Sequence, residues 1–125
     1  MREILLYLLM LVTDRACLVH QVLIESEAEP IAGKAMVAEV IRERSKRTGL
    51  GYCAIIDQPG QFGSRPLQPP PHAILSAIVA TAVRPTCSAV HFDVSGSRQG
   101  WAKNLPVACV VAGHVFYENE KWAAK

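Results

Sequence analysis

Residues 22–30, VLIESEAEP, place three carboxylates at the end of an apolar run and directly before a proline. Glu25 and Glu29 are four residues apart and share one face of a helix, where Glu25 continues the apolar stripe of Leu18 and Val22. Glu27 falls on the polar side of the same helix. Proline lacks an N–H group and fits the first turn of a helix, so Pro30 ends this helix or opens the next one.

The composition is that of one globular domain. The chain has 125 residues, of which half are hydrophobic, and its net charge is +2. It contains no basic run and no row of aromatic residues on which bases could stack, so we expect no nucleic-acid partner. Five basic residues gather in the segment after Pro30, and we interpret them as a solvated helix face: Lys34, Arg42, Arg44, Lys46 and Arg47.

The N-terminal segment, residues 1–12, allows two interpretations. Its apolar run from Ile4 to Val12 is too short to span a bilayer and has the length of a signal-peptide core. Glu3 is out of place in the basic start of a signal peptide, and a plain core helix fits the run equally well. Membrane contact is expected only through this segment, and residues 13–125 are expected to form a single domain.

The spacing of apolar residues predicts an α+β fold that is mainly helical. We expect helices over 4–12, from Thr13 or Asp14 to Ala28, over 31–47 and over 72–83. In the helix over 31–47, Lys34, Glu39, Arg42 and Glu43 are expected to face water. The short segment 52–56 could be either a helix or a strand. Residues 89–93 are strand-like, and residues 107–111 and 115–118 flank a turn, which predicts a small antiparallel sheet near the C-terminus.

The cysteines and histidines show no metal-site spacing. The four cysteines, at positions 17, 53, 87 and 109, are too far apart for a metal knuckle. Their even number would permit disulfides in an exported protein, but their pairing cannot be derived from the sequence. Cys17 and Cys109 lie in apolar runs and are interpreted as small buried hydrophobic residues. The histidines form no HExxH pattern, so neither a metal nor another cofactor is expected.

Glu25 has the surroundings that a general acid requires. Cleavage of a glycosidic bond needs an acid that is still protonated near neutral pH, and burial of a carboxyl group raises its pKa. Sugar rings stack on aromatic side chains and hydrogen-bond to planar polar groups. We therefore predict Glu25 as the catalytic residue and a sugar-binding groove formed by eight others: Glu29, Gln61, Phe62, His91, Phe92, Trp101, His114 and Tyr117. The alternative for the acidic cluster is the polar end of an ordinary helix.

Three motifs in order resemble the SleB-type cell-wall hydrolases, a family that includes spore-cortex-lytic enzymes and phage endolysins. The first motif runs from Ile24 to Pro30 and continues through Gly33 to Arg44. The second is Cys53 followed by Gln61-Phe62. The third comprises residues 89–92, Trp101-Ala102 and residues 113–117. The chain departs from the family pattern at four positions, where the family has Gly, Arg, Asn and Ser or Thr: Ile24, Glu27, Glu43 and Gly63.

The resemblance implies a lysozyme-like helical fold and cleavage of the β-1,4 bond between N-acetylmuramic acid and N-acetylglucosamine in peptidoglycan. It also implies that Glu25 is the essential acid of a lytic transglycosylase, in which the muramoyl 6-hydroxyl attacks the anomeric carbon and gives a 1,6-anhydro product. No second carboxylate is then required, although Asp57 or Asp93 would restore ordinary hydrolysis if it faced Glu25.

The compact domain, residues 13–125, is then catalytic, and the absence of an appended binding module favours a phage endolysin. We expect it to act as a monomer on glycan strands of the cell wall, in the periplasm or outside the cell. The alternative is a non-catalytic peptidoglycan-binding or sugar-binding relative of the same fold.

Overall fold

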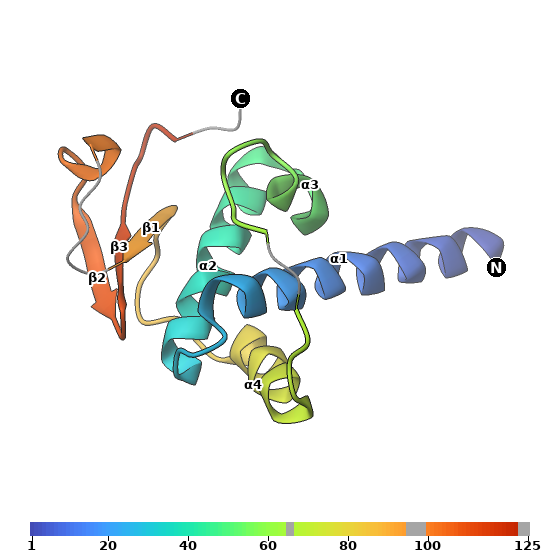
Figure 1. Cartoon of the computed structure of the whole chain (residues 1–125). Coiled ribbons are helices and arrows are strands. Elements are labelled where there is room, and N and C mark those ends of the chain that lie inside the picture. The colour runs from blue at the N-terminus through green and yellow to red at the C-terminus, as the bar shows by residue number, and fades with distance from the viewer. Residues whose placement is uncertain (65–66, 95–99, 123–125) are drawn as a thin grey trace.

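The computed structural model describes residues 1–64, 67–94 and 100–122. Its helices are α1 (Arg2–Ser26), α2 (Ile31–Thr48), α3 (Tyr52–Ile56), α4 (Pro71–Ala82) and the short 3-10 helix η1 (Gly100–Ala102). Strands β1 (His91–Val94), β2 (Val107–Val111) and β3 (His114–Tyr117) form, within these residues, a three-stranded sheet in the order β1-β3-β2. The sheet lies on the side of the molecule away from the N-terminus (Figure 1). The predicted α+β class with a small C-terminal sheet is confirmed.

Helix α1 is continuous through the position where a second helix was expected to begin, so that prediction was wrong. Thr13 caps nothing, because its hydroxyl donates to the carbonyl of Leu9 within the same helix at 2.9 Å. The described apolar side chains from Ile4 to Val12 are at least half exposed, and this end of α1 extends beyond the body (Figure 1). None of the described helices combines the length and apolar content needed to cross a membrane. The division at residue 12 stays a prediction.

Helix α2 is buried on two sides, which makes it the centre of the fold. On one side Val37 and Ile41 join Leu18, Val22 and Ile55 from the neighbouring helices. On the other side a second cluster faces the sheet, formed by Met36, Val40, Ala89 and Phe116. A fully buried side chain of this size contributes about 1.5–3 kcal/mol, so the two clusters fix the sheet against the helical body.

Two disulfides correct the interpretation of the cysteines. Cys17–Cys53 joins α1 to α3, and Cys87–Cys109 joins the segment before β1 to β2. Cys17 and Cys109 are therefore cross-linked and half-buried, and the prediction that they are simple buried hydrophobic residues was wrong. A disulfide typically contributes about 2–4 kcal/mol, because it restricts the unfolded chain.

The predicted hairpin is confirmed, and a third strand completes the sheet. Strands β2 and β3 are antiparallel and are joined by Ala112-Gly113, with Ala112 in the left-handed region at φ 51°. Strand β1 pairs with β3 so that Phe92 lies opposite Phe116 and His91 opposite Tyr117. This register brings the rings of Phe92 and Phe116 together, with their centres 5.8 Å apart.

Asp14 lies in α1, and its side chain caps the N-terminal end of α3. Its carboxylate accepts hydrogen bonds from the backbone N–H groups of Tyr52 at 2.8 Å and Cys53 at 3.1 Å, which are the first residues of α3. A Cβ atom at position 51 would lie 2.8 Å from the nearer carboxylate oxygen, so Gly51 is needed for this close approach. Asp14 therefore satisfies N–H groups at the start of α3 that the helix itself leaves unpaired.

Replacing Asp14 with alanine should lower the free energy of unfolding by about 1–2 kcal/mol, as loss of a capping side chain does. Asp14→Asn keeps one acceptor oxygen and should lose less. Urea denaturation of both variants measures the difference, with Glu3→Ala on the exposed part of α1 as the control. Equal stability of Asp14→Ala and the wild type would contradict the capping role.

Candidate active site

A groove of about 620 Å³ runs between the end of α1 and the sheet. Six of the nine predicted site residues line it: Glu25, Gln61, His91, Phe92, Trp101 and His114. The loop at residues 60–63 and the C-terminal segment after β3 supply further lining residues, among them Gly63, Asn119 and Trp122. These six predicted residues thus lie around one groove, although they come from five separate parts of the chain.

Glu25 is held by the loop that follows α3. Its Oε1 atom accepts one hydrogen bond from the Gly63 backbone N–H at 2.8 Å and another from Gln21 Nε2 at 3.0 Å. Gln21 also donates to the carbonyl of Gly63 at 2.9 Å, so the three residues form a closed triangle. Among the described residues, Oε2 of Glu25 has no hydrogen-bond partner.

The sequence interpretation missed Gln21, although a signal was present. Gln21 lies one helical turn before Glu25, away from the polar side, and it is almost completely buried. A buried amide must be hydrogen-bonded, so a glutamine among the apolar residues of α1 indicates a nearby polar group.

Glu29 connects α1 to the hairpin. Its Oε1 atom lies 3.0 Å from His114 Nδ1, and its Oε2 atom accepts a hydrogen bond from the Gly113 N–H at 3.3 Å. The Nδ1 atom of His114 is buried and has no aligned hydrogen bond among the described residues, so this contact is a close approach of the two side chains. A Cβ atom at position 113 would lie 2.7 Å from Glu29 Oε1, so only glycine allows this approach. Glu29 therefore sets the position of the hairpin relative to Glu25.

Lys34 is buried, which corrects its predicted place on a water-facing surface. Its ammonium group donates to the carbonyl of Glu27 at 2.9 Å and also to the carbonyl of Glu29. These carbonyls lie just beyond the C-terminal end of α1, where a cation is favoured. Burial lowers the pKa of Lys34, and the charges of Glu29 and Glu27 oppose that shift.

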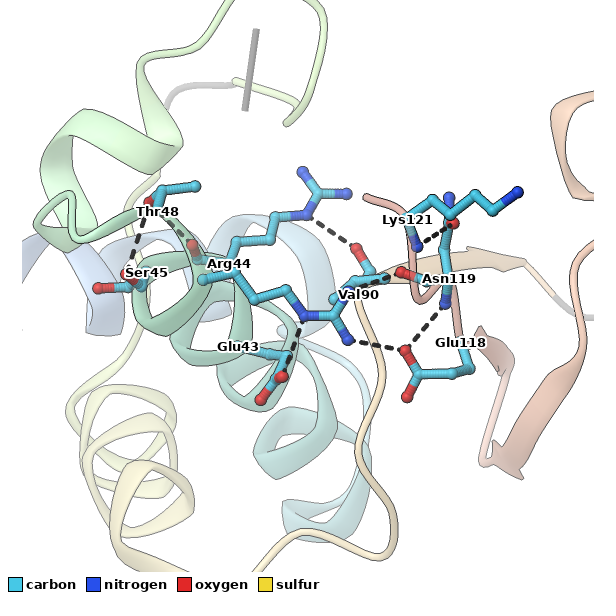
Figure 2. A network of polar contacts seen from close by, with 9 residues as sticks. Glu43, Arg44, Ser45, Thr48, Val90, Glu118, Asn119 and Lys121 are labelled. Carbon is cyan, nitrogen blue, oxygen red and sulfur yellow. Dashed lines mark hydrogen bonds and ion pairs between the residues drawn. The ribbon is translucent and has the colours of Figure 1, made fainter. Parts of the chain in front are cut away.

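Arg44 is also buried, which corrects its assignment to a solvated face. It donates to the Val90 carbonyl at 2.8 Å, to Gln61 Oε1 at 3.2 Å and to His91 Nδ1 at 3.2 Å. Figure 2 shows Arg44 reaching from α2 to Val90. Its guanidinium carbon lies 5.0 Å from the ring centres of both Phe62 and Trp122. Burial lowers the pKa of Arg44 to about 10, so it stays charged at neutral pH.

The contacts of His91 fix its protonation state. Arginine can only donate, so Nδ1 of His91 must accept and the proton lies on Nε2. Nε2 is 3.3 Å from the side-chain amide of Asn119, whose oxygen rather than nitrogen must therefore face it. Burial lowers the pKa of His91 to about 4, and the charges of Arg44 and Arg47 act in the same direction. His91 is a neutral groove residue with both ring nitrogens engaged.

The other aromatic residues predicted for the site differ in how far they are exposed. Phe62 packs against both hydrophobic clusters and under Arg44. Tyr117 is buried and meets the edge of Trp101, with ring centres 5.7 Å apart. Trp101 itself is 46% exposed and lies 5.3 Å from the ring of His91. Trp101 is therefore the more accessible surface for a ligand.

Other hollows lie beside α1. One, of about 510 Å³, lies between the end of α1 and the start of α4 and shares Glu25 with the groove. Another, of about 570 Å³, lies between α1 and α4, has a mainly apolar lining and includes none of the predicted site residues. Among the described residues, no group of three or more His, Cys, Asp and Glu side chains is arranged to hold a metal ion.

The low pKa of His91 should make the protein sensitive to acid. The unfolded chain takes up this proton near the ordinary value of 6.5, whereas the folded protein takes it up only near pH 4. Stability from this group is therefore full above about pH 6.5 and falls as the pH drops towards 4. His91→Gln should reduce the difference between the melting temperatures at pH 7 and pH 4.5, and His20→Gln, at an exposed position, should not. An unchanged difference in His91→Gln would contradict the assigned charge state.

Two solved structures share this fold. The catalytic domain of the germination-specific lytic transglycosylase SleB from Bacillus anthracis is 22% identical with a TM-score of 0.68, over 84% of this chain and 93% of that one. The catalytic domain of the Bacillus cereus SleB protein gives the same identity and TM-score, over 84% of this chain and 89% of that one. No family model matches the chain, and no curated protein matches its sequence. The chain has the fold of the SleB catalytic domains, which confirms the resemblance at the level of the fold.

Proposed function

We propose that this chain is a peptidoglycan-cleaving lytic transglycosylase. Its reaction would break the β-1,4 bond between N-acetylmuramic acid and N-acetylglucosamine, with Glu25 as the general acid and then the general base. The observation that carries the proposal is the position of the Glu25 carboxylate, which is oriented by Gln21 and Gly63 at the junction of two hollows. The similarity to a catalytic domain described as a lytic transglycosylase supports it.

The hydrogen bonds of Glu25 decide which oxygen would carry the proton. Both N–H donors point at Oε1, which leaves that oxygen with no lone pair for a proton. In the protonated form the O–H group is therefore on Oε2, which is the oxygen without a protein partner among the described residues. This arrangement presents the proton to a bound substrate instead of losing it to an internal hydrogen bond.

The two hollows suit a long substrate. Glu25 lines both the groove of about 620 Å³ and the hollow of about 510 Å³ beside α4. A glycan strand that passes from one to the other would place sugar rings on both sides of the carboxyl group. An acid that protonates a linking oxygen needs this arrangement, because the scissile bond lies between two bound rings.

The reaction then needs one carboxyl group. Glu25 Oε2 gives its proton to the oxygen that leaves with N-acetylglucosamine, as the bond to the muramoyl anomeric carbon breaks. The muramoyl 6-hydroxyl oxygen forms a bond to that carbon, and its proton passes to the Glu25 carboxylate. The product is a 1,6-anhydromuramoyl end, and the acid is restored without water.

Asp93 is the residue that would turn the reaction into hydrolysis. It is buried on β1 and lines the same groove as Glu25, whereas Asp57 is exposed just after α3. A carboxylate in this position could activate a water molecule as a general base. We favour the transglycosylase reaction because Oε2 of Glu25 and a muramoyl hydroxyl suffice for it.

The biological role forms part of the proposal. We propose that the enzyme acts as a monomer on the cell wall, as a phage endolysin. The alternative is a relative that binds glycan strands without cleaving them. The orientation of Glu25 favours catalysis, because a binding module gains little from holding a carboxyl group of which one oxygen has no partner among the described residues.

Glu25→Gln should lower the rate at which purified peptidoglycan suspensions clear by at least about a hundredfold, as loss of a general acid does. Asp57→Asn, an exposed carboxylate outside the groove, is the matched control and should clear at the wild-type rate. The glutamine side chain can still accept the Gly63 hydrogen bond, so the variant should stay folded, as circular dichroism would show. Clearing by Glu25→Gln at the wild-type rate would rule out this mechanism, and binding by the wild type without clearing would favour the alternative.

The chemical nature of the product separates the two reactions. Mass spectrometry of the soluble fragments should find 1,6-anhydromuramoyl ends, which are one water lighter than reducing ends. Asp93→Asn should still give anhydro ends if Glu25 works alone. Reducing ends in the wild-type digest, lost in Asp93→Asn, would identify a hydrolase that uses both carboxyl groups.

A further inference from the structure

The C-terminal segment 118–122 is hydrogen-bonded to α2 through Arg47. Arg47 donates through Nη1 to the Asn119 carbonyl at 2.6 Å and through Nη2 to Glu118 at 2.8 Å. Its Nε atom donates to Glu43 on the same helix at 3.1 Å. Figure 2 shows Glu43 on α2 and the pair Glu118 and Asn119 joined through one guanidinium group. Burial acts to lower the pKa of Arg47, but the hydrogen bonds and charges of Glu118 and Glu43 together raise it.

The fastened segment brings two side chains to the groove. Asn119 and Trp122 both line it, and the Asn119 amide lies 3.3 Å from Nε2 of His91. The indole of Trp122 lies over the Arg44 guanidinium at 5.0 Å and meets His91 edge-on at 6.5 Å between ring centres. The cation occupies one face of the indole, so only the opposite face is available to a ligand.

Trp122 and Trp101 contact the same histidine. His91 lies 5.3 Å from the ring of Trp101 and 6.5 Å from that of Trp122. All three rings line the groove that contains Glu25. Indole rings stack on the apolar faces of pyranose sugars, and a side-chain amide can bond the hydroxyl and acetamido groups at their edges.

We propose that segment 118–122 forms a sugar-binding subsite at one end of the groove, in which Trp122 stacks on an N-acetylated pyranose ring and the Asn119 amide bonds to its edge. Arg47 is a positioning residue, which acts only by holding the segment against α2. The inference rests on the proposed function for the identity of the ligand. It adds Trp122, Asn119 and Arg47 to the residues predicted from the sequence.

The chain contains only two tryptophans, Trp101 and Trp122, so each can be observed alone. The experiment uses the full chain carrying Glu25→Gln, so that turnover does not interfere, and the probe is the β-1,4-linked tetramer of N-acetylglucosamine. In Glu25→Gln with Trp101→Phe, the emission of Trp122 should change on titration with the tetramer. The dissociation constant should match the one reported by Trp101 when Trp122 is replaced by Phe.

Binding affinity measured by calorimetry tests the same subsite in variants that lack the Trp122 fluorophore. Trp122→Ala should bind the tetramer about tenfold more weakly in calorimetry, the size expected for loss of one aromatic contact. Trp122→Phe should retain most of the affinity, because it keeps a stacking face. Glu120→Ala changes an exposed neighbour in the same segment and should bind like its parent.

Arg47→Ala should weaken tetramer binding as Trp122→Ala does and shift the emission of Trp122 to longer wavelength, whereas Arg47→Lys should recover part of both. A melting-temperature loss without either change would show a merely structural role. The subsite is ruled out if the emission of Trp122 does not change on addition of the tetramer, whether or not the emission of Trp101 changes. Clearing of peptidoglycan by the enzyme with Glu25 intact tests the proposed function separately, so the two proposals can fail independently.

Discussion

The site depends on how the C-terminal end of α1 is held. Lys34, buried at the start of α2, donates to the carbonyls of Glu27 and Glu29, which lie just past the last turn of α1. The Glu29 carboxylate in turn reaches His114 and Gly113 of the hairpin. One short segment thus joins α1, α2 and the sheet, one turn after Glu25. A shift of this segment would move the carboxyl group relative to both walls of the groove.

The groove combines a permanent charge with a neutral ring. Arg44 keeps its charge although it is buried, because a carbonyl, an amide and two aromatic faces replace the water around it. Burial lowers the pKa of His91 to about 4, the charge of Arg44 acts in the same direction, and the hydrogen bond from Arg44 fixes the tautomer. The groove therefore sets a neutral imidazole ring and a buried cation beside the carboxyl groups of Glu25 and Asp93.

Periodicity predicted the positions of α2, α4 and the hairpin, but it divided α1 near residue 12 and left the segment of α3 undecided. It could not identify the partners of polar residues, which depend on the tertiary structure. Asp14 has the chemistry of a helix start, but the helix that it caps begins at residue 52. Lys34 and Arg44 have the chemistry of surface residues, but backbone carbonyls that accept hydrogen bonds from both, and two aromatic rings beside Arg44, offset the cost of burying them. The disulfide pairing likewise required the spatial proximity of α1 and α3, which no spacing rule supplies.

The continuous helix α1 has two halves that should differ in how often they open. Up to Val12 its described apolar side chains are at least half exposed, so this half relies on its own helix propensity, and isolated helices of this length are marginal in water. From Asp14 onward a cap, a disulfide and the main core hold the backbone. Amide hydrogens before Thr13 should therefore exchange with solvent orders of magnitude faster than those after it. The backbone of α1 has no break near Thr13, but the free energy of local unfolding should rise sharply from one side of Thr13 to the other.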